Sequence, residues 1–176
     1  DGEYIAVGSR DNKVYLFDKD SSTPLWSYET DGDVRSVAIS ADGEYIVAGS
    51  SDLYLFGKDS NTPLWTYDID NRVEHVAISA DGEYLTVGTQ TAGVYLFDKD
   101  SSTPLWNYDV NQASVAISAD GEYIVAGSYG YDDASKVYLF DKDSSTPLWS
   151  YTSGEDVEIE TVAISADGEY IVAGSD

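Results

Sequence analysis

Three short sequence motifs recur along the chain in one fixed order, and this repetition constrains the fold more than any other feature. Asp-Gly-Glu-Tyr begins at positions 1, 42, 81, 120 and 167. Thr-Pro-Leu-Trp begins at positions 23, 62, 103 and 146, and Val-Ala-Ile-Ser begins at positions 37, 76, 115 and 162. Three motifs in the same order leave little room for chance, so the chain consists of about four copies of one unit of roughly 40 residues.

Each copy is predicted to form four short strands, here called A, B, C and D. The best examples are residues 34–40 for A, 45–50 for B, 14–17 for C and 25–28 for D. β-Branched and aromatic residues occur in short runs, and no helical spacing is present. Gly43 suits a tight A–B turn, and Pro24 suits the start of an outer strand. Four antiparallel strands per unit of about 40 residues predict an all-β fold, a β-propeller of four-stranded blades.

The packing of the blades also follows from the repeat. Ala48 and Gly49 are small enough for neighbouring blades to approach closely, and Trp26 and Tyr28 are expected to fill the wider outer gap. We expect one domain over residues 1–176, with repeats beginning near 1, 42, 81 and 120 and a partial repeat at 167.

The order of the predicted strands does not close neatly into a ring. The chain opens at strand B and ends at strand B of a later copy. In a closed four-bladed ring, either segment 1–9 or segment 167–175 would be redundant, because both are strand B. An unpaired strand edge invites another chain. We therefore expect an incomplete ring or one that chains complete for each other, a homo-oligomer through open blade edges. A compact four-bladed closure with a displaced terminal strand is the alternative.

Composition limits the partners. The net charge of −24 argues against nucleic acid and anionic lipid. It suits a salty environment or simply keeps the chain soluble. Without Cys no disulfide can form, and without Met we expect a portion or processed form of a longer protein. All apolar runs are short, so no membrane insertion is expected. We expect a secreted location or a prokaryotic cell surface.

Two families resemble this chain at the repeated motifs. The run Val-Ala-Ile-Ser-Ala-Asp-Gly-Glu-Tyr resembles WD-repeat blades, and Val-Tyr-Leu-Phe-Asp-Lys-Asp-Ser-Ser-Thr-Pro-Leu-Trp resembles PQQ-like (quinoprotein-type) blades. The WD-repeat resemblance implies an interaction platform. The chain departs from both patterns, because Phe17-Asp18 replaces Trp-Asp and Ser22 stands where the PQQ-like motif has Gly. The absence of Cys removes the vicinal pair of quinone-dependent dehydrogenases, so their activity is not carried over.

Few residues suggest catalysis or metal binding. His75 is the single histidine and could belong to a nucleophile–His–acid triad, but drift at a polar strand position is the favoured interpretation. Asp18, Asp20 and Ser22 could offer oxygens to calcium, although turn formation explains them better. The pair Asp132 and Asp133 is expected by chance in so acidic a chain. We therefore expect no enzyme activity, no catalytic residue, no cofactor and no metal.

Loop lengths suggest a recognition surface. The A–B and C–D loops lie at one end of a propeller and keep their lengths in every copy. All length changes fall in the B–C and D–A loops, at what we call the variable-loop end. Loops on rigid scaffolds carry recognition, and Tyr beside Gly, Ser and Asp is common in binding loops. The predicted interaction face comprises Tyr129, Tyr131, Asp132, Asp133, Glu155 and Asp156. Free drift of unconstrained loops is the alternative.

These observations predict a non-enzymatic binding or scaffold module for a protein or a small ligand. A cationic or sugar-like partner would suit the acidic, aromatic face best. Two alternatives stay open: a purely structural spacer, and the propeller portion of an enzyme whose active site lies elsewhere.

Overall fold

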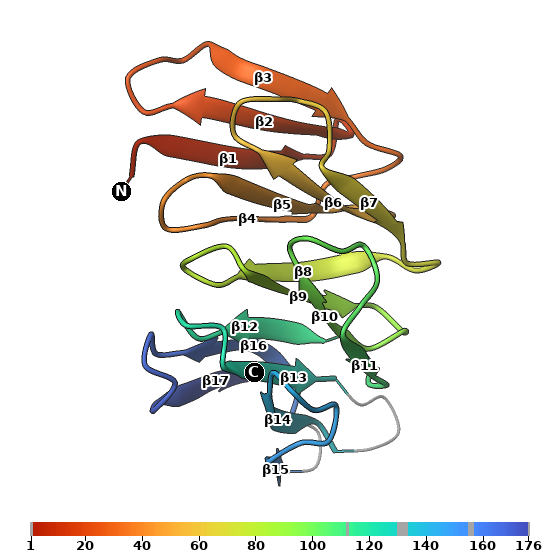
Figure 1. The fold of residues 1–176 in the computed structure, drawn as a ribbon. Helices are drawn as coiled ribbons and strands as arrows, with labels where there is room; N and C mark the ends of the chain where they lie inside the picture. Colours follow the sequence, from red (N-terminus) through yellow and green to blue (C-terminus); the bar gives the residue numbers. More distant parts are fainter. Residues whose placement is uncertain (1, 112, 130–133, 155–156, 176) are drawn as a thin grey trace.

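The computed structural model describes residues 2–111, 113–129, 134–154 and 157–175, and every regular element in these ranges is a β-strand. The strands form five antiparallel sheets, each built from consecutive strands (Figure 1). The expectation of an all-β fold of antiparallel, mostly four-stranded blades is confirmed.

The five sheets follow the chain. The first sheet holds β1 (Tyr4–Ser9), β2 (Lys13–Asp18) and β3 (Pro24–Glu29). The second holds β4 (Ser36–Ile39), β5 (Tyr45–Gly49), β6 (Asp52–Gly57) and β7 (Trp65–Asp68). The third holds β8 (Val73–Ile78), β9 (Tyr84–Thr89), β10 (Val94–Asp98) and β11 (Trp106–Tyr108). The fourth holds β12 (Ser114–Ile117), β13 (Tyr123–Ser128), β14 (Lys136–Asp141) and β15 (Trp149–Thr152), and the fifth holds β16 (Ile159–Ile164) and β17 (Ile171–Ser175).

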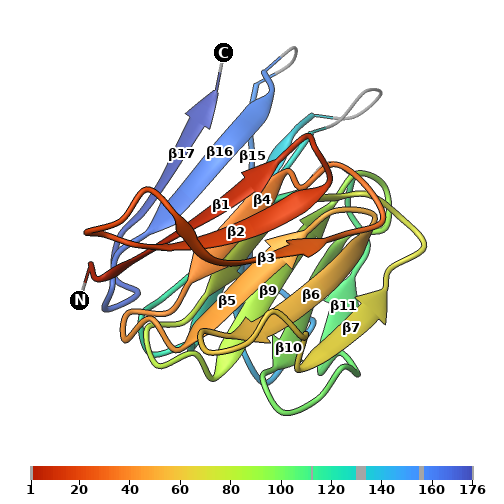
Figure 2. The same ribbon diagram turned by 90° about the horizontal axis from the view of Figure 1, so that it is seen from above.

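The first strands of successive sheets lie side by side and form the inner wall of the arc. β4 contacts β8, β8 contacts β12, and β12 contacts β16. Hydroxyl groups link these strands: Ser36 Oγ accepts from the Val76 amide at 3.0 Å, and Ser114 Oγ accepts from the Val162 amide at 3.3 Å. Figure 2 looks along the stack from the β1–β3 end. β4, β8, β12 and β16 are therefore the A strands predicted from the repeat.

The first A strand is shorter than predicted. β4 begins at Ser36, although the predicted strand began at residue 34. The Val34 amide donates to the Ser9 carbonyl of the preceding sheet at 3.1 Å. The chain at Val34 therefore joins two blades instead of extending the sheet ladder.

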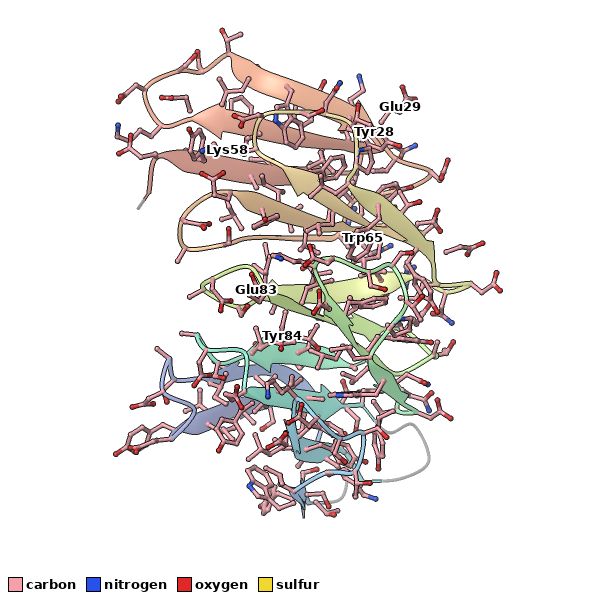
Figure 3. The ribbon with its side chains drawn as sticks, viewed as in Figure 1. Tyr28, Glu29, Lys58, Trp65, Glu83 and Tyr84 are labelled. Atoms are coloured by element: carbon pink, nitrogen blue, oxygen red, sulfur yellow. The ribbon has the colours of Figure 1, made fainter. Side chains whose placement is uncertain are left out.

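Close approach between blades depends on the small residues at the ends of the B strands. A Cβ on Gly49 would clash with Val73, and a Cβ on Gly88 would clash with the carbonyl of Ala113. Further out, Trp26 packs on Phe56 with ring centroids 5.3 Å apart, and Trp65 of β7 (Figure 3) packs in the same way on the next sheet. The predicted inner and outer packing is confirmed.

The stack of sheets is an open arc. β1–β3 stands at one end with three strands, β16–β17 carries two, and these two sheets share no core cluster (Figure 1). The predicted unclosed arrangement is therefore what the structure shows. None of the described segments forms a helix long and apolar enough to cross a membrane.

Candidate functional site

A polar pocket of about 470 Å³ opens at the variable-loop end of the inner wall. We call it the inner pocket; it is lined by Arg72, Glu74, His75, Gln90, Tyr129, Glu158, Ile159 and Glu160. Arg72 and Glu158 precede A strands, and Gln90 and Tyr129 follow B strands. The pocket therefore collects the ends of the D–A and B–C loops, the two loop types that vary between copies.

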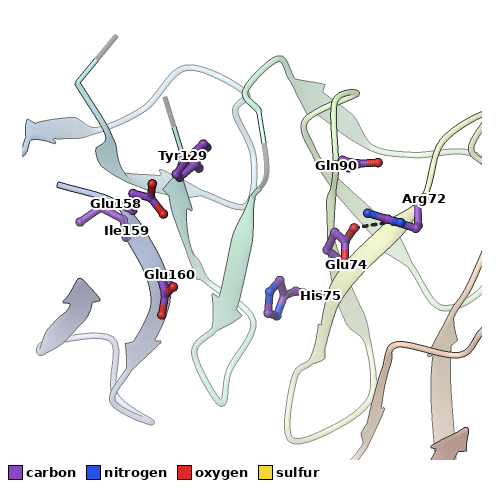
Figure 4. A pocket seen from close by; sticks show the side chains of 8 residues that line it. All are labelled: Arg72, Glu74, His75, Gln90, Tyr129, Glu158, Ile159 and Glu160. Carbon is purple, nitrogen blue, oxygen red and sulfur yellow. Dashed lines mark hydrogen bonds and ion pairs between the residues drawn. The ribbon is translucent and has the colours of Figure 1, made fainter. Parts of the chain in front are cut away.

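Two strand irregularities shape opposite sides of the inner pocket. The β8–β9 register shifts between Val73 and His75, and the β16–β17 register shifts between Ile159 and Thr161. The extra residues at these bulges are Glu74 and Glu160. A bulge re-aims side chains at the edge of a sheet. Both acids line the pocket, which Figure 4 shows between the two strands.

The two sides differ in charge balance. Glu74 accepts from Arg72 Nε at 2.6 Å and lies 3.8 Å from an Arg35 guanidinium nitrogen. On the opposite side, Glu158 and Glu160 form no ion pair with a base within the described ranges. The β16 side of the pocket thus carries two uncompensated carboxylates, and a cation can approach them from solvent.

His75 lies on the β8 side of the pocket (Figure 4). Its side chain reaches solvent, but the surrounding walls remove enough water that desolvation lowers its pKa, while the Glu74 carboxylate acts weakly in the opposite direction. His75 is therefore mainly neutral at neutral pH. No hydroxyl or carboxylate is hydrogen-bonded to it in the described part of the chain, so the triad geometry considered from the sequence is not assembled there.

One residue of the predicted interaction face lies in this site. Tyr129 lines the inner pocket and also a second hollow of about 160 Å³ with Asn111 and Lys136. Tyr131, Asp132, Asp133, Glu155 and Asp156 lie outside the described residues. The structure therefore places Tyr129 between two hollows at the variable-loop end.

The acidic C–D loops have a local structural role. Asp18 Oδ1 accepts from the Asp20 amide at 2.8 Å, and Asp98 Oδ1 accepts from the Asp100 amide at the same distance. These contacts are Asx turns, the interpretation favoured from the sequence. Across the described ranges, no group of three His, Asp or Glu side chains is placed to hold a metal ion.

Sequence reasoning missed most of the inner pocket. Arg72, Glu74 and Glu160 were not singled out, and His75 was attributed to drift. Glu74 and Glu160 are far apart in sequence and share only their place at the start of an A strand. Alignment of the copies at Val76 and Val162 would have revealed acids two residues before each.

The stacked antiparallel sheets, their inner strands and the pocket at the strand ends define a β-propeller built from repeats. Residues 49–176 match the family model PQQ_2, described as "Outer membrane protein assembly factor BamB". That match covers more than half of the chain, so the chain belongs to this family. Residues 22–55 also match the model described as "WD domain, G-beta repeat".

A solved structure supports the same fold. A chain of Kuenenia stuttgartiensis hydrazine synthase superposes with a TM-score of 0.82 at 16% identity, over 99% of this chain and 53% of that one. The chain thus spans about half the length of the structure it matches, and likeness at this identity shows the fold alone. No curated protein sequence matches the chain.

Proposed function

We propose that the chain is a non-enzymatic binding module that takes a cationic group of a protein or peptide into the inner pocket. The observation that carries this proposal is the pair Glu158 and Glu160, uncompensated by a base in the described residues, on the wall of a 470 Å³ pocket. The net charge of −24 adds a long-range attraction for a positive partner. Arg72 opposite can position an acceptor group of the same ligand.

The placement of the pocket supports a recognition role. A rigid inner wall supplies the acids, and variable loops surround the opening, as in other folds that carry binding on loops. Tyr129 lies at the rim, and an aromatic ring attracts a nearby lysine or arginine side chain. WD-repeat and PQQ-like propellers commonly mediate interactions, which agrees with this assignment.

The proposed location is outside the cytoplasm, in a secreted or surface protein of a prokaryote. The family description names an outer membrane protein assembly factor, which supports an envelope context.

A lysine-rich peptide tests the binding proposal. Binding of a fluorescent ten-residue lysine peptide is measured by anisotropy, with a ten-residue glutamate peptide as the comparison. We expect the double variant Glu158→Gln/Glu160→Gln to bind about tenfold more weakly, since two charge pairs of about 0.5–1 kcal/mol each are lost.

The matched control removes the same charge at the other end. Asp20 and Asp59 are exposed acids on C–D loops, so Asp20→Asn/Asp59→Asn tests net charge alone. Equal loss of affinity in both double variants would overturn the pocket as the site. Absence of binding to the lysine peptide at low salt would overturn the cationic ligand.

A further inference from the structure

The outer face of the last complete sheet repeats a contact surface that is covered everywhere else. At the three internal blade boundaries the tryptophan of strand D packs on a phenylalanine of the next sheet: Trp26 on Phe56, Trp65 on Phe97 and Trp106 on Phe140. The fourth tryptophan, Trp149 of β15, is 42% exposed, and its neighbour Tyr151 is 63% exposed. We call the surface of β15 and β17 the donating face.

A hollow of about 420 Å³ lies on this face. Its apolar walls come from β14, β15 and β17 and include Leu139, Trp149, Tyr151 and Ile171. On the side away from this hollow, Tyr170 just before β17 and Val172 within it are 70% and 65% exposed, since successive side chains of a strand alternate. Tyr170 and Val172 occupy the repeat positions of Tyr45 and Val47, which pack in a core cluster with the following sheet.

The opposite end of the same chain carries the matching surface. Phe17 of β2 occupies the repeat position of Phe56, Phe97 and Phe140, which are fully buried, but Phe17 is only half-buried. The carbonyl of Lys19 occupies the position of the Lys58 carbonyl, which accepts a hydrogen bond from the Trp26 indole at 2.7 Å. We call this surface the receiving face.

We propose that two copies of the chain associate head to tail, with the receiving face of one on the donating face of the other. The β2–β3 hairpin of the second copy completes the β16–β17 sheet as its strands C and D. Trp149 then packs on Phe17 of that copy and its indole donates to the Lys19 carbonyl. The occupant is a second copy because the chain itself presents the side chains and the carbonyl that the internal boundaries use.

Because strand B occurs at both ends of the chain, replacing β1 by β17 of another copy costs little free energy. β1 (Tyr4–Ser9) and the segment 170–175 have nearly the same sequence, Tyr-Ile-Ala-Val-Gly-Ser and Tyr-Ile-Val-Ala-Gly-Ser. β17 can therefore take the place of β1 beside β2 with the same ladder of hydrogen bonds. The burial of Trp149 and Tyr151 on association then supplies the net favourable free energy. Exchange of identical elements is a low-cost route to dimers.

The expected assembly is a closed ring of two copies. Each copy contributes four blades when its incomplete end sheets are combined, so two copies give about eight, within the range of known propellers. A head-to-tail interface closes into a ring when the rotation permits it. Each copy carries a charge of −24, so association is expected to strengthen with salt.

Engineered cysteines test the proposed orientation. At an internal boundary, Asn61 Nδ2 donates to the Ser27 carbonyl at 3.1 Å. Ser22 and Ser150 occupy the same two repeat positions at the two ends of the chain. The native sequence has no cysteine, so Ser22→Cys/Ser150→Cys and the internal control Ser27→Cys/Asn61→Cys each place one thiol on either side of a boundary, within reach of a short bismaleimide cross-linker.

We expect the cross-linker to join the internal pair within one chain and the terminal pair between two chains on a denaturing gel. The wild type should show twice the 19.1 kDa chain mass by light scattering at 1 M NaCl. Trp149→Ser/Tyr151→Ser should weaken this association at least tenfold, whereas Leu105→Ser, at a residue 51% exposed elsewhere, should not.

A strict monomer at high concentration would overturn the proposal. So would a Ser22–Ser150 pair closed within one chain, or a dimer indifferent to Trp149 and Tyr151. The proposal does not depend on ligand binding in the inner pocket.

Discussion

The indole nitrogen of Trp26 donates a hydrogen bond to the main-chain carbonyl of Lys58, 32 residues later, at 2.7 Å. The bond joins the outer strand of one blade to the loop of the next. Trp65 and Trp106 make the same bond to the Lys99 and Lys142 carbonyls, at 2.6 and 2.7 Å. One repeated side chain therefore fixes both the packing and the hydrogen bonding at each outer boundary.

Replacement of Trp65 by Phe should destabilise the protein, because the Lys99 carbonyl loses its donor while an aromatic ring is retained. We expect a loss of about 1–3 kcal/mol in the free energy of unfolding. Trp149→Phe is the matched control, and at concentrations that keep the chain monomeric it should change stability by less than about 0.5 kcal/mol. Urea unfolding followed by circular dichroism measures both. Equal losses would show that the indole bond is not what matters.

The inner boundary depends on glycine at the end of strand B. In Gly88→Ala the added Cβ would meet the Ala113 carbonyl, which is backbone and cannot turn aside. We expect a loss of about 1–3 kcal/mol, or a melting temperature lower by about 2–4 °C for each kcal/mol. Gly57→Ala is the control, because no atom lies within 4 Å of its Cβ. A Gly88→Ala variant as stable as Gly57→Ala would contradict the close approach of the blades.

The strands were readable from the sequence because the copies repeat the same signals. Gly43, Pro24 and the aromatic–aliphatic alternation each recur, so an error in one copy is corrected by the others. Tyr129 was found because loop lengths differ only at one end. The acids of the inner pocket could not be found in this way. Glu74 and Glu160 line one pocket because the inner wall curves and because each lies at a bulge, and both features depend on packing between sheets.

The single histidine allows its titration to be followed cleanly by proton NMR. We expect the pKa of His75 to lie below the ordinary 6.5, because desolvation in the pocket disfavours the charged ring. The folded state then binds fewer protons than the unfolded state between the two values. The stability associated with His75 is therefore present above the unfolded pKa and is lost as the pH falls through the folded pKa.

A His75→Gln variant provides the control for this effect, because it cannot titrate. Its melting temperature should fall less than that of the wild type between pH 7.5 and pH 5. A His75 midpoint at or above 6.5 would mean that the pocket is more open to water than the structure indicates.

Salt should stabilise the fold. The 33 acidic residues exceed the 9 basic ones, so the compact state repels itself at low ionic strength. Exposed pairs such as Lys19 with Glu3 contribute little, so their screening costs less than the repulsion that salt removes. We expect the melting temperature to rise by several degrees between 0.05 and 1 M NaCl, and sucrose at equal osmolality separates screening from exclusion effects. A fall in melting temperature with NaCl would show that ion pairs outweigh repulsion.

The central claim is that recognition occurs in the inner pocket, and an NMR titration with the ten-residue lysine peptide tests it most directly. We expect the shifted amides to cluster at His75, Gln90, Tyr129 and residues 158–160. The A–B turns at the opposite end, such as residues 41–45, should stay unchanged. Shifts confined to those turns, or spread evenly over the acidic surface, would contradict it.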